Sequence, residues 1–250
     1  MNSTCRSGQG QSRTAPRSPR PPHRPHAPPG LPPEGITREG ITRRGIGGGW
    51  LPDRPGRQPG TLDDVTPVPA RPSRDELQAA YGRVVPDLVR PGLAVLLCGI
   101  NPSLWSGAVG LHFATPGNRL WPALHAAGWT DCRLQPHETG AVLAAGLGIT
   151  NLVMRATARA DELDDDELRA GLPRLEAVAL QYAPRYIAFL GLSAYRVATG
   201  ERKAAVGPQD RTIGPSRVWL LPNPSGLNAS WQLPRLAGAY GALREAATRR

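Results

Sequence analysis

The last two-thirds of the chain alternates short apolar runs with longer amphipathic stretches. Residues 93–99 form an uncharged run of strand length, which is typical of a strand buried on both faces of a parallel sheet. Three further segments also have strand character, at residues 148–153, 186–191 and 217–221. The pattern therefore predicts a sheet of four strands.

Apolar residues at helical spacing occupy the segments between these strands. Ser73 and Glu76 form a capping-box pattern, which predicts a helix that includes Tyr81 and Val85 and ends at the Pro-Gly pair of residues 91–92. Further helices are predicted over about residues 118–127, 138–145, 161–182, 193–199 and 233–248. A long loop is expected from residue 101 to residue 116.

Strands that alternate with helices predict an α/β fold, a three-layer α/β/α arrangement around a short, mostly parallel central sheet. In such sheets a ligand binds outside the carboxyl ends of the strands. This rule selects three loops as candidate site segments, at residues 101–116, 151–157 and 222–230.

The first third of the chain has a different composition. Residues 1–74 contain 15 prolines, 12 arginines and 5 acidic residues, so most of the net charge of +10 lies there. Such a segment buries too little apolar surface to fold, so we expect a disordered tail at 1–74 and one catalytic domain at 75–250. The tail is either a basic arm that binds nucleic acid or a solvated linker. A start codon assigned too far upstream would also explain it.

Composition excludes several classes of protein. No run of about 18 apolar residues is present, so we expect no membrane-spanning helix and no membrane partner. The N-terminus lacks the apolar core of a secretory signal, so we expect a cytoplasmic, nucleoid-associated protein. Cys5, Cys98 and Cys132 form no CxxC pair, and the histidines form no ligand pattern. We therefore expect neither a metal nor a cofactor.

Two of the candidate loops open with the same tripeptide. Asn101-Pro102-Ser103 follows the first strand, and Asn223-Pro224-Ser225 follows the fourth. Proline holds the preceding residue in extended geometry, so both asparagine amides are expected to face the same cleft. A single such tripeptide would indicate only a turn. Two copies at equivalent strand ends favour a site that orients a water or reads the edge of a base.

Together these motifs resemble one enzyme family. They are Gly99-Ile100-Asn101-Pro102-Ser103, Phe113-Ala114-x-Pro116-x-Asn118-Arg119-x-Trp121, Gly148-Ile149-Thr150-Asn151-Leu152-Val153 and Leu221-Pro222-Asn223-Pro224-Ser225-Gly226-Leu227. In order and spacing they are similar to the mismatch-specific uracil-DNA glycosylase and thymine-DNA glycosylase family. The resemblance implies a monofunctional glycosylase that flips a uracil out from opposite guanine, cleaves its glycosidic bond and so initiates base excision repair. Thymine and bulky cytosine adducts opposite guanine are further candidate substrates.

The resemblance also assigns roles to individual residues. Asn101 corresponds to the catalytic asparagine that positions water, and Phe113 to the aromatic residue that stacks on the flipped base. Ile100, Ser106 and Asn223 would bind the base. The predicted DNA contacts are Ser225, Gly226, Leu227, Asn228 and Arg155. The expected partner is double-stranded DNA with G·U or G·T mismatches, bound by a monomer.

Three positions depart from the family pattern. Ser103 replaces a frequent glycine, Trp105 is bulkier than the expected residue, and Asn228-Ala229 stands where some members carry an arginine. Asn101 is not a general base, because an amide has no useful pKa, and no acidic residue occurs between residues 93 and 130. Turnover should therefore depend mainly on stabilisation of the leaving base.

Two other functions remain open from the sequence. One is a non-catalytic nucleic-acid-binding protein on the same scaffold, dominated by the basic tail. The other is a small-molecule nucleotide-binding α/β enzyme, against which the absence of GxGxxG and GxxxxGK[ST] loops counts.

Deletion of residues 1–70 should leave the fold unchanged and weaken DNA affinity mainly at low salt, because the tail contributes charge and no core. Thermal melting and DNA titration at two salt concentrations test this. A loss of many degrees in Tm would show instead that the tail is structural.

Overall fold

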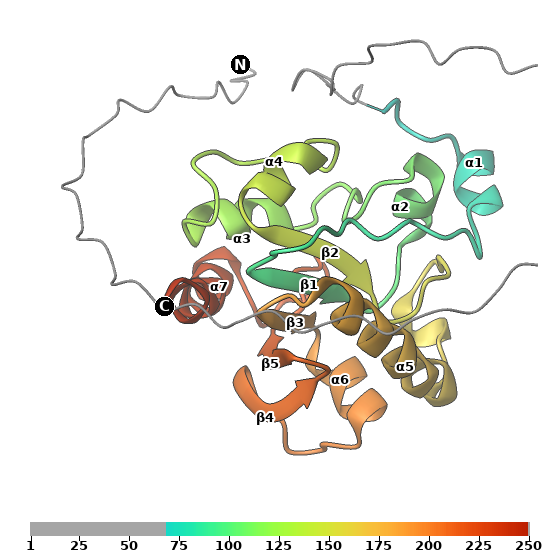
Figure 1. Ribbon diagram of the computed structural model, residues 1–250. Coiled ribbons are helices and arrows are strands. Elements are labelled where there is room, and N and C mark those ends of the chain that lie inside the picture. The colour runs from blue at the N-terminus through green and yellow to red at the C-terminus, as the bar shows by residue number, and fades with distance from the viewer. Residues whose placement is uncertain (1–68, 250) are drawn as a thin grey trace, which may run out of the picture. The chain divides into compact units, whose positions relative to one another are not determined.

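The computed structural model describes residues 69–249, and the predictions made for residues 1–68 lie outside this part of the chain. Five strands form one sheet in the order β2-β1-β3-β5-β4. They are β1 (Val95–Gly99), β2 (Leu147–Asn151), β3 (Tyr186–Leu190), β4 (Gly207–Ile213) and β5 (Ser216–Leu221). All pairs are parallel except β4 with β5. The predicted mostly parallel central sheet is confirmed (Figure 1).

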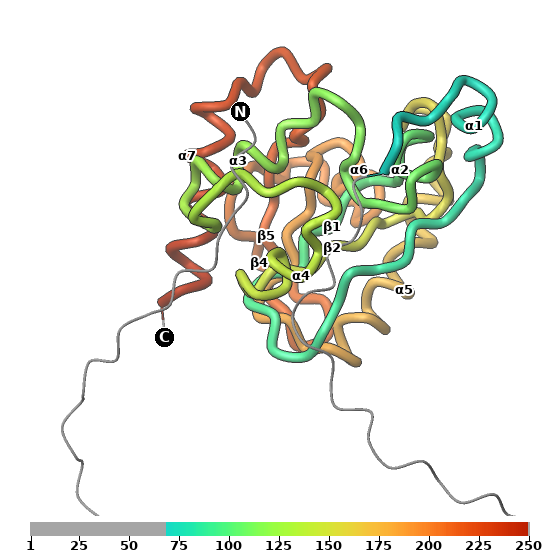
Figure 2. Tube along the Cα trace, turned by 90° about the horizontal axis from the view of Figure 1, so that it is seen from above, coloured from blue at the N-terminus to red at the C-terminus, as the bar shows by residue number. Residues whose placement is uncertain are grey.

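Helices cover both faces of this sheet (Figures 1 and 2). The helices are α1 (Arg74–Ala79), α2 (Leu104–Val109), α3 (Leu120–Ala126), α4 (Thr139–Ala144), α5 (Asp165–Tyr182), α6 (Leu192–Thr199), α7 (Leu233–Thr248) and the 3₁₀ turn η1 (Ala160–Glu162). Side chains of α3, α4 and α7 bury one face, and those of α5 and α6 bury the other. The predicted three-layer α/β/α fold is confirmed. None of the helices within residues 69–249 is long and apolar enough to cross a membrane.

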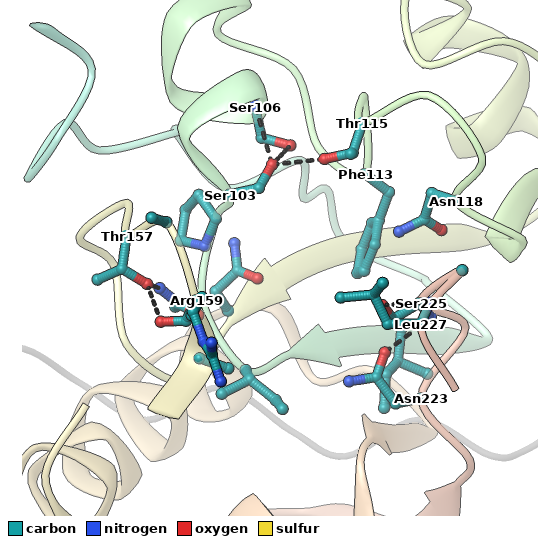
Figure 3. Close-up of a pocket in the computed structure, with 18 of the residues that line it drawn as sticks. Ser103, Ser106, Phe113, Thr115, Asn118, Thr157, Arg159, Asn223, Ser225 and Leu227 are labelled. Carbon is teal, nitrogen blue, oxygen red and sulfur yellow. Dashed lines mark hydrogen bonds between the residues drawn. The ribbon is translucent and has the colours of Figure 1, made fainter. Parts of the chain in front are cut away.

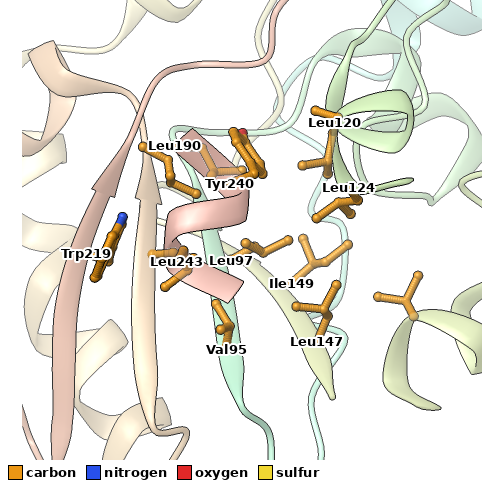
Figure 4. Close-up of a cluster of buried hydrophobic side chains, with 14 of the residues drawn as sticks. Val95, Leu97, Leu120, Leu124, Leu147, Ile149, Leu190, Trp219, Tyr240 and Leu243 are labelled. Atoms are coloured by element: carbon orange, nitrogen blue, oxygen red, sulfur yellow. The ribbon is translucent and has the colours of Figure 1, made fainter. Parts of the chain in front are cut away.

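Alternation along the strands divides the core into two clusters. Val95 and Leu97 of β1 face α3 and α7, whereas Leu96 and Cys98 face α5 and α6. Figure 4 shows the first cluster, in which Leu124 lies near the strands beside residues of α7. Every residue of β1, β2 and β3 is buried, which explains why their sequences show continuous apolar runs rather than alternation.

The prediction of four strands was wrong by one, because β4 was missed. This strand is a polar edge strand, and most of its residues are at least partly exposed. It pairs antiparallel with β5 alone, so its outer side needs no apolar residue. Hydrophobic patterning carries no signal for such a strand.

The helices on either side of β1 in the sequence also differ from the prediction. The loop predicted at 101–116 contains α2, which begins where Ser103 Oγ accepts a hydrogen bond from the Ser106 backbone at 3.1 Å. The first helix, predicted to continue to residues 91–92, ends at Ala79. Beyond it the backbone pairs with Ala156, which accepts from Gly82 and donates to Arg83, both at 2.8 Å. These long-range bonds replace further helical ones.

The helix predicted over 161–182 is interrupted. The 3₁₀ turn η1 precedes α5, and Asp164 caps α5 by accepting a hydrogen bond from the Glu167 backbone at 2.7 Å. The acidic residues at the start of α5 therefore partly serve as a cap, in addition to favouring the positive end of the helix dipole.

Helix α5 packs closely on the end of β2 at Gly171. A Cβ at this position would overlap the carbonyl oxygen of Leu152 and lie 2.9 Å from its side chain. Gly171→Ala should therefore lower the free energy of unfolding by about 1–3 kcal/mol, measured by urea denaturation. Gly238→Ala in α7 is the control: nothing lies within 4 Å of its Cβ position, and alanine there should stabilise by about 0.5–1 kcal/mol. Equal effects at both positions would contradict the close packing.

Candidate functional site

A cavity of about 790 Å³ opens at the carboxyl edge of the sheet, where the sequence placed the site. Its walls come from the segments that follow β1, β2 and β5 (Figure 3). Eight of the sequence-predicted residues line it: Ile100, Asn101, Ser106, Phe113, Asn223, Ser225, Gly226 and Leu227. The structure thus brings these residues together, and their individual roles stay predictions.

The amide of Asn101 is oriented by two acceptors. Its Nδ2 donates to the carbonyl oxygen of Arg155 at 3.1 Å and to Thr157 Oγ1 at 2.7 Å. Thr157 Oγ1 in turn donates to the carbonyl of Arg159 at 2.7 Å. A backbone carbonyl only accepts, so the amide nitrogen must face these partners. Asn101 Oδ1, which has no hydrogen-bond partner within residues 69–249, is left as the acceptor available to a water.

Hydroxyl groups form the upper wall of the cavity in Figure 3. Ser103 Oγ lies 2.7 Å from Thr115 Oγ1 and 3.2 Å from Ser106 Oγ. Ser106 is 2% exposed, and its Oγ also accepts a hydrogen bond from the Ala114 backbone at 3.2 Å. Ser103 at the position of the frequent family glycine therefore has a structural role, because it caps α2 and ties this helix to the loop that carries Phe113.

The ring of Phe113 projects into the cavity from that loop (Figure 3). Its backbone has a φ of 50°, a left-handed conformation that is rare for an aromatic residue. Trp121 Nε1 donates to its carbonyl oxygen at 3.2 Å and holds this strained turn in place. Strain of this kind is common where a ligand must be contacted. The conformation supports a binding role for Phe113 rather than a core role.

The floor of the cavity depends on the absence of a side chain at Gly99. A Cβ there would lie 3.0 Å from the Phe113 ring and would overlap Asn151 Oδ1. Asn151, 2% exposed, donates from Nδ2 to His112 Nδ1 at 3.3 Å. His112 Nε2 lies 2.9 Å from the Pro86 carbonyl, which only accepts, so the proton is on Nε2. Burial lowers the pKa of His112, and the ring is neutral.

A polar cluster that includes Arg174 of α5 holds the end of β2 in place. Arg174 of α5 donates to Asp87 at 2.8 Å, to Thr150 Oγ1 at 2.8 Å and to the carbonyl oxygen of Asn151. Thr150 Oγ1 also donates to Asp87 at 2.7 Å. These contacts fix the backbone from which the Asn151 amide reaches the cavity.

Comparison with known proteins identifies the family. Residues 86–244, well over half of the chain, match the family described as the Uracil DNA glycosylase superfamily. The chain belongs to this superfamily. The match covers the whole sheet and every segment that lines the cavity. Also similar is a solution NMR structure of a candidate uracil DNA glycosylase from Methanosarcina acetivorans, with 18% sequence identity, a TM-score of 0.45, and coverage of 66% of this chain and 98% of that chain.

Two of the predicted DNA contacts in this superfamily member lie outside the cavity lining. Arg155 forms an ion pair with Glu167, its Nε lying 2.6 Å from Oε1, and a second hydrogen bond of 2.7 Å joins the same groups. Asn228 donates from Nδ2 to the carbonyl of Asn223 at 3.0 Å, within its own loop. Arg155 must release Glu167 or share its guanidinium before it contacts a phosphate.

Residues that sequence reasoning did not assign to the site also line the cavity of this glycosylase-superfamily fold. They include Asn118, Asn151, Thr157 and Asp161, and Asp161 is paired with Arg159. Arg159 Nε donates to Asp161 Oδ1 at 3.0 Å and lowers the pKa of that carboxyl group. Residues 93–130 contain no acidic residue, but η1 brings Asp161 to the cavity. Within residues 69–249, no group of three His, Cys, Asp or Glu side chains is placed to hold a metal ion.

The neutral state of His112 predicts a pH dependence of stability. Its folded-state pKa lies below the unfolded value of about 6.5, so the unfolded chain gains the proton first as the pH falls. This contribution to stability is present above about pH 6.5 and is lost as the pH drops through the folded-state pKa. Wild type should therefore lose more unfolding free energy between about pH 7.5 and pH 5 than His112→Gln does. Parallel losses in urea denaturation would contradict the assignment.

Proposed function

We propose that this protein is a monofunctional DNA glycosylase that excises uracil mispaired with guanine, and that it initiates base excision repair. Membership of the uracil-DNA glycosylase superfamily supports a hydrolytic enzyme that acts on DNA. The resemblance of the motifs to the mismatch-specific and thymine-DNA glycosylases supports the narrower substrate. The observation that carries the proposal is the orientation of Asn101, which lines the same cavity as the Phe113 ring and whose amide nitrogen is held by Arg155 O and Thr157 Oγ1.

Asn101 positions the attacking water in this mechanism. Both hydrogens of its amide have acceptors, Arg155 O and Thr157 Oγ1, so Oδ1 accepts a hydrogen from the water and directs the water oxygen at C1′ of the sugar. Because an amide takes up no proton near neutral pH, the side chain orients the nucleophile without deprotonating it. As the water oxygen bonds to C1′, the electron pair of the glycosidic bond leaves with the uracil anion, and the proton of the water then passes to that anion or to bulk water.

The flipped base binds between polar groups and the Phe113 ring. Stacking on one aromatic face contributes about 1–3 kcal/mol. Asn151 Oδ1 has no hydrogen-bond partner within residues 69–249, and it is an acceptor suited to the N3–H of uracil, which cytosine lacks. Ser106 and Asn223 add hydroxyl and amide groups at the cavity wall. Where these hydroxyl and amide groups donate hydrogen bonds to the uracil oxygens, they stabilise the negative charge that develops as the base departs.

Leu227 is the part of the site that engages the duplex. Its side chain is 95% exposed at the tip of the loop after β5. An apolar side chain that enters the space left by an extruded base lowers the cost of flipping, which is least at a mismatch such as G·U. Exposure of a leucine without packing partners is consistent with such a wedge.

The decisive test is alkaline strand cleavage of a labelled duplex that carries one G·U pair, with A·U, G·T and single-stranded uracil as comparison substrates. Strongest cleavage at G·U supports both the activity and the mismatch preference. No cleavage of any substrate by folded protein would favour a non-catalytic nucleic-acid-binding protein.

Asn101→Ala should lower excision of uracil by at least about 100-fold, because the water loses its orienting acceptor, and should leave mismatch binding largely intact. Single-turnover cleavage and DNA titration measure the two effects. Gln181→Ala removes another amide, from an exposed position in α5, and should leave excision unchanged. Excision retained in Asn101→Ala would overturn the role of this residue.

A further inference from the structure

Arg119 lies at the start of α3 and reaches beneath the loop that carries Leu227. Its guanidinium donates to the carbonyl oxygens of Ser225 and Asn228, the second at 2.7 Å, and to Gln232 Oε1 at 3.2 Å. Its backbone N–H donates to the Pro224 carbonyl at 2.9 Å. One residue therefore holds the backbone on both sides of the exposed leucine.

Few other contacts fix the position of this loop relative to the cavity. Leu227 makes no core contact, and the hydrogen bonds within the loop, such as Leu227 N to Ser225 Oγ at 3.3 Å, set its internal shape only. A further contact is made at Gly226, where a Cβ would lie 2.9 Å from the carbonyl oxygen of Gly117, two residues before Arg119. The loop is thus seated on the segment 117–119, which also carries the cavity residue Asn118.

The chemistry of Arg119 fits this role. Within the described residues it pairs with no carboxylate, and its Nε is buried without a hydrogen-bond partner. A planar guanidinium bridges two backbone carbonyls, whereas the ammonium of a lysine is a point donor on a flexible stem. This partly buried arginine, whose guanidinium donates to loop carbonyls and one amide oxygen, therefore contributes mainly to the position of that loop.

We propose that Arg119 is a positioning residue that holds Leu227 ready to enter a duplex, and so determines how well the enzyme uses double-stranded rather than single-stranded DNA. The inference rests on the proposed glycosylase function. A wedge that is ordered before binding loses less entropy on insertion. Single-stranded uracil needs no wedge, because no partner base has to be separated and no gap has to be filled.

Arg119→Met and Arg119→Lys test this with single-turnover excision from G·U duplex and from single-stranded uracil DNA. Excision from the duplex should fall by about tenfold to a hundredfold in Arg119→Met, and excision from the single strand should stay within about threefold. Arg119→Lys keeps the charge and should still lose most of the duplex activity. Equal losses on both substrates would show a general effect on the cavity and overturn the proposal.

Two controls separate positioning from charge and from folding. Arg235→Met removes a nearby guanidinium that lies over Trp231, 4.4 Å from the ring centroid, and donates to Ser230; it should affect the two substrates alike. Leu227→Ala alone should lower duplex excision. Combined with Arg119→Met it should add little further loss, because the two changes disable the same step. Fully additive losses would contradict the proposal.

Failure of the proposed function remains distinguishable. If wild type cleaves neither substrate, the fluorescence of 2-aminopurine placed beside the G·U pair still reports unstacking by the wedge. The rise in fluorescence on binding should then be reduced in Arg119→Met and retained in Arg235→Met. An unchanged rise in Arg119→Met would overturn the role of Arg119 on its own.

Discussion

Gly99 and Asn151 are partners in the parallel pairing of β1 with β2, and the amide oxygen of Asn151 occupies the space that a side chain at Gly99 would fill. The Phe113 ring approaches the same point from the loop between α2 and α3. The cavity therefore depends on one close approach between neighbouring strand ends. Asn151 is held at this place from more than one side, by His112 at its amide and by Arg174 at its carbonyl oxygen.

Two sets of contacts provide that support, and both connect the site to distant parts of the chain. His112 fixes the Asn151 amide and is itself fixed by Pro86, while Arg174 of α5 fixes the Asn151 backbone through a cluster that includes Asp87. The segment before β1 thus contributes to both. A partly buried ion pair adds little net stability by itself, since desolvation offsets much of its attraction. Its contribution here is to orientation.

The sequence was sufficient for the features that hydrophobic burial controls. Strands β1, β2, β3 and β5 are apolar because helices cover them, and the strand-end rule then located the cavity. Strand β4 and helix α2 were not predicted from the sequence. Strand β4 is a polar edge strand, and α2 is a short helix that begins at a proline-serine turn. Thr157 lies in a loop that the strand-end rule selected, but its hydrogen bond with Asn101 and the place of Asp161 in the cavity wall arise from tertiary contacts that the sequence does not reveal.

The charge distribution of the cavity constrains the proposed chemistry. Arg159 and Asp161 at the rim are largely exposed and paired with each other, and the deeper groups are amides, hydroxyls, an aromatic ring and a neutral imidazole. A neutral floor accepts an uncharged uracil without a desolvation penalty for a buried ion. As the bond to the sugar breaks in the proposed reaction, the base becomes an anion, and the groups of the cavity floor offer fixed dipoles to stabilise it. The proposed reaction should then depend strongly on the acidity of the departing base, and leaving-group chemistry would determine the selectivity among lesions together with the fit of the base beside Phe113 and Ser106.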